Sequence, residues 1–197
     1  MRRASDPRPT PPGVGYLRLR AFLFLAALLC ASAGTARPAN AQDVGLDLGT
    51  VPAAATLEDL DGNDVDLARW VGRQPVLIEF WAHWCEQCEA LMPKLDAVAK
   101  RYVGRVEIII VAVGVNQTRR SVTRHMARHA LPGTVLFDGA GRAVRAYRAP
   151  ATSYVVALDA GGRVVYTGVG PDQDLAGAAA LAVAGSPPGD RPPAPGR

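Results

Sequence analysis

A pair of cysteines at the end of an apolar run is the feature that most constrains how this chain can fold. The run Val76–Trp81 has the length of a strand and carries a single charge, at Glu79. Cys85 and Cys88 follow, and apolar residues then recur at helical spacing as far as Tyr102. The pattern predicts a buried strand followed at once by a helix that begins at Cys85.

The rest of the chain predicts strands and helices in alternation. Residues 106–113 are almost continuously apolar and β-branched, which is typical of a strand covered on both faces. The other expected strands are 55–60, 65–67, 134–137, 154–158 and 164–167, and the other expected helices are 119–129, 143–148 and 172–184. This order predicts an α/β fold in which a central mixed β-sheet is flanked by helices on both faces.

The two ends of the chain differ in composition from its body. Residues 1–41 carry six arginines against one acid, with an apolar run at 21–33 and small residues at 39–41. This pattern predicts a signal peptide and hence an exported, extracytoplasmic or periplasmic protein, with an uncleaved membrane anchor as the alternative. Residues 42–185 are expected to form the folded domain, and the Pro-rich residues 186–197 a disordered tail.

The net charge of +4 belongs to the N-terminal segment. Residues 42–197 contain 16 basic and 17 acidic residues. A body without basic excess has nothing to attract a phosphate backbone, so no nucleic-acid partner is expected. Contact with a membrane is expected only if the N-terminal segment stays attached.

Removal of the signal would leave Cys85 and Cys88 as the only cysteines. A disulfide between residues so close in sequence closes a tiny loop and stabilises a fold little, so the pair is predicted to be chemical. At a helix N-terminus, Cys85 faces free backbone N–H groups that favour the nucleophilic thiolate. Cys88, one turn later on the same face, could resolve a mixed disulfide. The pair carries the electrons itself, and no cofactor is expected.

A zinc site is the alternative for two cysteines at this spacing. It would need a second pair of ligands, and His125 and His129 could supply one at i, i+4 spacing. No metal is predicted, because no further cysteine remains in the mature chain.

The segment Val76–Cys88, followed by Pro93, resembles the thioredoxin superfamily and within it the TlpA/ResA/CcmG branch. The resemblance covers about residues 45–184, and it extends to the strand-turn-strand at 159–165. It implies a thioredoxin-like fold and a thiol–disulfide oxidoreductase, with protein disulfides as substrates and apocytochrome c among the candidates. A membrane or periplasmic thiol reductant would supply the electrons. The chain departs from thioredoxin between the cysteines, where Glu86-Gln87 replaces Gly-Pro.

The resemblance also implies roles for individual residues. Glu79 stands where thioredoxins carry a buried acid, and burial would raise its pKa so that it could exchange a proton with Cys88. Trp84 is expected beside the disulfide, on the surface that binds substrate. Glu86 and Glu79 both oppose a very stable thiolate, which favours a reductase over a strong oxidant.

The family further carries a proline, preceded by a cis peptide bond, that faces the cysteines and pairs with the substrate chain. Two alignments compete, one with Pro150 in that place and one with Ala151. Because cis bonds belong almost wholly to proline, we expect the cis bond at Ala149–Pro150, with both residues in the substrate-binding site.

Two other functions are compatible with the fold. Copper-handling relatives carry a wider CxxxC spacing, and peroxide-reducing relatives carry Thr or Ser where Ala82 stands, so both are weaker alternatives.

Overall fold

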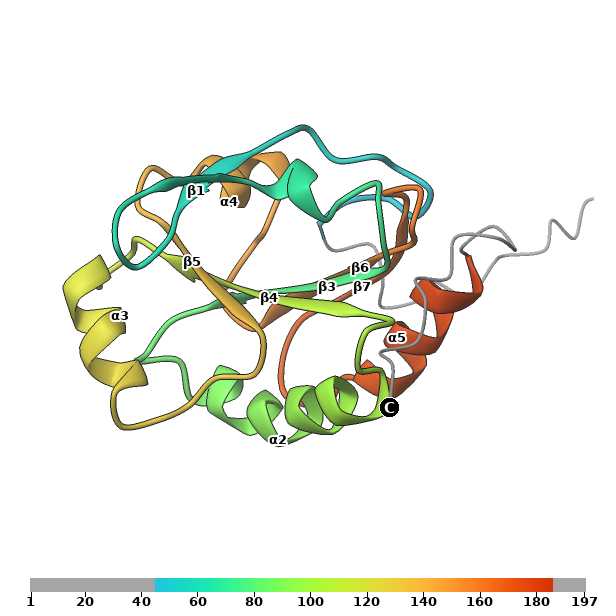
Figure 1. The fold of residues 1–197 in the computed structure, drawn as a ribbon. Helices are drawn as coiled ribbons and strands as arrows, with labels where there is room; N and C mark the ends of the chain where they lie inside the picture. Colours follow the sequence, from blue (N-terminus) through green and yellow to red (C-terminus); the bar gives the residue numbers. More distant parts are fainter. Residues whose placement is uncertain (1–44, 186–197) are drawn as a thin grey trace, which may run out of the picture. The chain divides into compact units, whose positions relative to one another are not determined.

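A computed structural model describes residues 45–185 of the chain (Figure 1). The predicted signal or anchor at 1–41 and the predicted tail at 186–197 lie outside the described residues. Those two predictions therefore stand as they were made.

The described residues are built on one sheet of seven strands in the order β2-β1-β5-β4-β3-β6-β7. The strands are β1 Thr56–Glu58, β2 Asp64–Asp66, β3 Val76–Trp81, β4 Glu107–Val113, β5 Thr134–Asp138, β6 Tyr154–Leu158 and β7 Val164–Gly168. β3, β4 and β5 run parallel, while β1, β2, β6 and β7 join through antiparallel pairs. The sheet is mixed, as predicted.

The central strands form the floor of the core. Every residue of β3 is buried, and so is every residue of β4 after Glu107. The prediction that residues 106–113 form a strand covered on both faces is therefore confirmed for β4. β3 lies between β4 and β6, so Glu79 pairs in register with Ile110 on one side and Val155 on the other.

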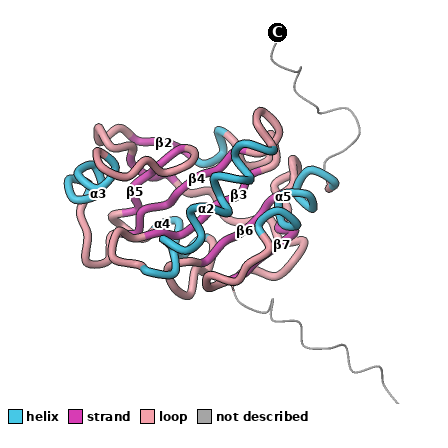
Figure 2. Tube along the Cα trace, turned by 90° about the horizontal axis from the view of Figure 1, so that it is seen from below, coloured by secondary structure: helices cyan, strands magenta, loops and turns pink. Residues whose placement is uncertain are grey.

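Helices cover both faces of the sheet. They are α2 Glu86–Arg101, α3 Arg119–Met126, α4 Arg142–Ala146 and α5 Leu175–Ala184, with a short 3₁₀ helix at Leu67–Arg69. α2 and α5 pack together on one face, and α4 lies on the other (Figures 1 and 2). This arrangement confirms the predicted thioredoxin-like α/β fold. Among residues 45–185, no helix is long and apolar enough to cross a membrane.

The carboxyl ends of the parallel strands define one edge of the sheet. β3 ends at Trp81 and leads into α2, while β4 ends at Val113 and leads into α3. Because β3 and β4 are parallel neighbours, the starts of both helices meet at this edge. The two cysteines lie there.

Candidate active site

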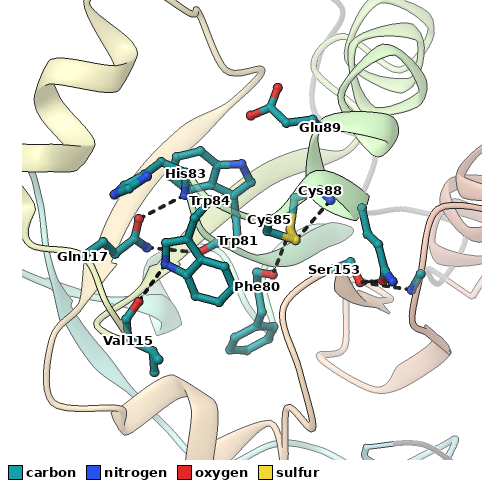
Figure 3. The surroundings of a disulfide bond; sticks show 12 residues. Phe80, Trp81, His83, Trp84, Cys85, Cys88, Glu89, Val115, Gln117 and Ser153 are labelled. Atoms are coloured by element: carbon teal, nitrogen blue, oxygen red, sulfur yellow. Dashed lines mark hydrogen bonds between the residues drawn. A yellow bond between two sulfur atoms is a disulfide. The ribbon is translucent and has the colours of Figure 1, made fainter.

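Cys85 and Cys88 form a disulfide at the start of α2, with their Cα atoms 5.2 Å apart (Figure 3). Cys85 is the N-cap residue of the helix, and its Sγ accepts a hydrogen bond from the backbone N–H of Cys88 at 3.1 Å. A helix N-terminus leaves such N–H groups free and presents the positive end of the helix dipole. Both effects favour negative charge on the sulfur of Cys85.

The two sulfur-bearing residues differ in access to solvent. Cys85 is 6% exposed and Cys88 is fully buried. The Sγ of Cys88 lies 4.0 Å from the carbonyl oxygen of Phe80, to which a reduced thiol there could donate. An incoming disulfide can therefore reach Cys85 more readily than Cys88.

Glu79 is fully buried in the middle of β3, as predicted. Within the described part of the chain, neither carboxylate oxygen has a hydrogen-bond partner. Burial, and after it the charge of Glu89, raises the pKa of Glu79 well above its ordinary value. Burial therefore favours the protonated form of this side chain over the charged form.

The two tryptophans around the cysteines have different surroundings. Trp84 is 44% exposed, and its Nε1 donates to the carbonyl oxygen of Val115 at 3.0 Å. Trp81 is fully buried, with its ring centroid 5.1 Å from that of His125. Trp84 thus offers an apolar surface beside the disulfide, while Trp81 belongs to the core (Figure 3).

Gln117 is a site residue that the sequence pattern did not single out. Its buried side chain donates to the carbonyl oxygens of Trp81, at 3.3 Å, and Val113, at 2.6 Å, and accepts from the N–H of His83 at 3.1 Å. One amide therefore fixes the segment that leads into the cysteines against the segment that leaves β4 (Figure 3). A lone Gln before a helix gives no sequence signal for such contacts.

The predicted cis bond at Ala149–Pro150 is wrong, because no peptide bond in residues 45–185 is cis. Pro150 is exposed and precedes β6 by four residues. The chain instead changes direction at Arg148, with φ of 47°, and Ser153, with φ of 62°. Two left-handed residues are enough to bring the chain back into β6 through trans bonds.

Ser153, rather than Pro150, is the residue that joins this loop to the cysteine motif. Its N–H donates to the carbonyl oxygen of Phe80 at 2.8 Å, the same oxygen that Cys88 approaches. Its hydroxyl lies 3.0 Å from Oε1 of Gln87, between the two cysteines, and accepts from the N–H of Gly170. The signal was present in the alternative alignment, which places Thr152-Ser153-Tyr154 directly after the family's proline position.

The structure brings three histidines together near the disulfide. The ring of His125 lies 4.7 Å from that of His129 and 6.3 Å from that of His83, measured between centroids. Nε2 of His125 is 3.8 Å from a carboxylate oxygen of Glu89. Among residues 45–185, no group of three His, Cys, Asp or Glu side chains is arranged to hold a metal ion.

Comparison with known proteins agrees with this geometry. The Redoxin family model matches residues 47–181, and the chain belongs to that family. The chain is 33% identical to Thioredoxin C-2 of Corynebacterium nephridii over 86 residues, which cover 43% of this chain and 77% of that protein. It is 26% identical to thiol-disulfide oxidoreductase ResA of Geobacillus thermodenitrificans over 152 residues, which cover 75% of this chain and 86% of the relative.

Solved structures show the same fold. StoA from Bacillus subtilis superposes with a TM-score of 0.54 at 19% identity, covering 65% of this chain and 96% of StoA. The pneumococcal exposed lipoprotein thioredoxin Etrx1 gives 0.56 at 24%, covering 66% and 98%. Together with the Cys85–Cys88 pair, the family and the relatives define a thiol–disulfide oxidoreductase of the ResA type.

Proposed function

We propose that this oxidoreductase acts outside the cytoplasm as a protein-disulfide reductase, with Cys85 as the attacking and Cys88 as the resolving cysteine. The observation that carries the proposal is the unequal setting of the two sulfurs. Cys85 caps the helix, accepts an N–H and keeps a small exposed fraction, whereas Cys88 is fully buried.

The reaction follows from this setting. The thiolate of reduced Cys85 attacks one sulfur of a substrate disulfide, and the other substrate sulfur leaves as a thiolate that takes up a proton. The thiol of Cys88 then loses its proton and attacks Sγ of Cys85, which breaks the mixed disulfide and releases the second substrate thiol. Two electrons pass to the substrate, and the enzyme is left with the Cys85–Cys88 disulfide that the structure contains.

Glu79 is the proposed proton partner of Cys88. A buried carboxyl with a raised pKa can take up a proton near neutral pH, which an ordinary exposed glutamate does poorly. It lies on β3 next to Phe80, whose carbonyl oxygen approaches Cys88. The carboxylate form would accept the proton of the resolving thiol, and the protonated form would return it when the enzyme is reduced again.

The acids around the pair support the reductive direction. Glu86 and Glu89 occupy the first turn of α2. Negative charge at this position opposes a thiolate at Cys85, and a less stable thiolate accompanies a more reducing couple. The couple should therefore be closer to the reducing members of this fold than to the strong oxidants.

The substrate surface is proposed to combine Trp84 with the loop that contains Ala149 and Pro150. Both Trp84 and Pro150 are exposed, and Ser153 ties this loop to Gln87 within the motif. Protein disulfides are the expected substrates, apocytochrome c being one candidate. A membrane-bound or periplasmic thiol would restore the dithiol.

Trapping the mixed disulfide tests the assignment of the cysteines. Cys88→Ser should accumulate a covalent complex with a protein disulfide, visible on a non-reducing gel, and Cys85→Ser should not. The reduction potential, measured by equilibration with glutathione, tests the direction. Equal trapping by both variants would refute the roles, and a potential near about −120 mV would refute a reductase.

A further inference from the structure

The stretch of chain that contains α3 carries an unbalanced positive charge. Residues 108–137 contain four arginines, two histidines and neither Asp nor Glu. The remainder of residues 42–197 contains 12 basic and 17 acidic residues. Positive charge is therefore concentrated on one element of an otherwise acidic body.

Most of this charge has no carboxylate partner. Arg119 pairs with Glu58 of β1. Arg120 and Arg124, one turn apart on α3, and Arg128 just beyond its end form no ion pair within residues 45–185. All three are exposed, so their guanidinium groups are available to a partner.

A hollow of about 470 Å³ opens on this side of α3. It is lined by His83, Ser121, Arg124, His125, Ala127 and Arg128. Burial lowers the pKa of His125 and so disfavours its charged form, whereas Arg124 and Arg128 are permanent positive charges of the hollow. We call this hollow, with its lining residues, the basic pocket.

The basic pocket includes a residue of the segment that leads into the cysteines. His83 lines it and precedes Cys85 by two residues (Figure 3). His125 lines it from α3 and faces Glu89, in the first turn of α2, at 3.8 Å. A protein chain bound at Cys85 can therefore place its neighbouring side chains in the pocket.

We propose that the basic pocket binds acidic side chains that flank the disulfide of the protein substrate. This inference rests on the proposed exchange at Cys85 and narrows its substrate class. Guanidinium groups match the planar geometry of carboxylates and can bind them through paired hydrogen bonds. A long polyanion or an anionic membrane is a poorer occupant, because it would meet the acidic remainder of the surface on either side.

Peptides that differ only in charge test the proposal. Three peptides carry the same internal disulfide, flanked by Asp and Glu, by Ser and Gln, or by Lys. The reduced enzyme should favour the acidic over the neutral peptide by about 3- to 10-fold in kcat/KM, and the preference should shrink as salt rises. Arg124→Gln with Arg128→Gln should abolish the preference, whereas Arg101→Gln with Arg105→Gln, an equal charge change at the far end of α2, should preserve it.

A binding measurement separates this proposal from the proposed function. Peptides with Ser in place of Cys are titrated into the oxidised protein, and tryptophan fluorescence or calorimetry reports binding without turnover. Tighter binding of the acidic peptide, lost in the Arg124 and Arg128 variant, supports the pocket even if no peptide is reduced. Equal binding of all three peptides, or a preference that survives the double substitution, overturns the proposal. Turnover of all three at one rate would overturn it too, while leaving the reductase intact.

Discussion

Glu79 shows how far a single residue can be interpreted from sequence. Its apolar neighbours and the resemblance to thioredoxins predicted its burial and a raised pKa, and the structure agrees with both. Gln117 could not be recognised in the same way, and Ser153 only through the alternative alignment that was not preferred. Their importance comes from partners tens of residues away in the chain, at Gln87 and at Trp81 and His83, and only the folded sheet edge brings these together.

Glu79 should make stability depend on pH. Its pKa is raised on folding, so its contribution is most favourable below the ordinary pKa of glutamate and is lost as pH rises through the raised pKa. In urea unfolding, the stability of the wild type relative to Glu79→Gln should fall by up to about 1.4 kcal/mol per pH unit across that window. Asp172→Asn, at an exposed site, is the control. A difference independent of pH would mean that folding does not raise the pKa of Glu79.

Ser153 and Gln87 should be energetically coupled. Ser153→Ala leaves the N–H of Gly170 without its acceptor and should cost about 1–3 kcal/mol. The double variant with Gln87→Ala should lose less stability than the sum of the two single losses, by about 0.5–1 kcal/mol, because both changes remove the same hydrogen bond. Thr152→Ala combined with Gln87→Ala should be additive. Additivity of the Ser153 pair within about 0.3 kcal/mol would show that the contact is not formed in solution.

Whether a segment forms a helix or a strand was easier to predict than the residues at which it begins and ends. The predicted helix at 119–129 ends at Met126, and the one at 172–184 begins at Leu175 because Asp174 caps it, its side chain accepting from the N–H of Gly177. Caps are local hydrogen bonds that several residues of a polar stretch could make, so sequence alone does not select among them. The loop before β6 was predicted wrongly for a related reason. Arg148 and Ser153 have left-handed φ values, but neither is a glycine, the residue type that usually indicates such a conformation in a sequence.

Gln117 connects the segment after β3 with the segment after β4, so its removal should destabilise both. Gln117→Ala leaves the N–H of His83 and two carbonyl oxygens without the partner they have now. We expect a loss of about 2–4 kcal/mol in the free energy of unfolding, with faster amide exchange at His83. Gln74→Ala, a half-buried site away from the cysteines, should cost much less. A loss below about 0.5 kcal/mol would show that water replaces the amide without penalty.

For the whole molecule, the sequence predicted architecture well because its signals agree with one another. A β-branched central run, alternating helices and a strand–CxxC–helix junction each point to the same layered sheet, and the Redoxin match over residues 47–181 accords with them. Because these local patterns all fit the same architecture, they favour this fold over other arrangements of the same elements.

The location of the molecule is a separate prediction. Residues 1–44, fused to a phosphatase that folds only outside the cytoplasm, should give an active reporter in bacteria, because the arginine flank and the apolar run have the form of an export signal. Replacing apolar residues in 21–33 by charged ones should silence the reporter. A fusion as inactive as one without the leader would place the enzyme inside the cell.

The short span of the Cys85–Cys88 bridge has a thermodynamic consequence. A link between residues three apart restricts the unfolded chain little, so oxidised and reduced protein should differ in stability mainly through what the fold does to the two sulfurs. By a closed cycle, that difference equals the shift in redox potential that folding imposes on the couple, with about 30 mV for each 1.4 kcal/mol. If the fold makes the couple more reducing than it is in the unfolded chain, the disulfide form unfolds at higher urea. Two unfolding curves would then report how far folding shifts the potential of this couple, without any electron donor.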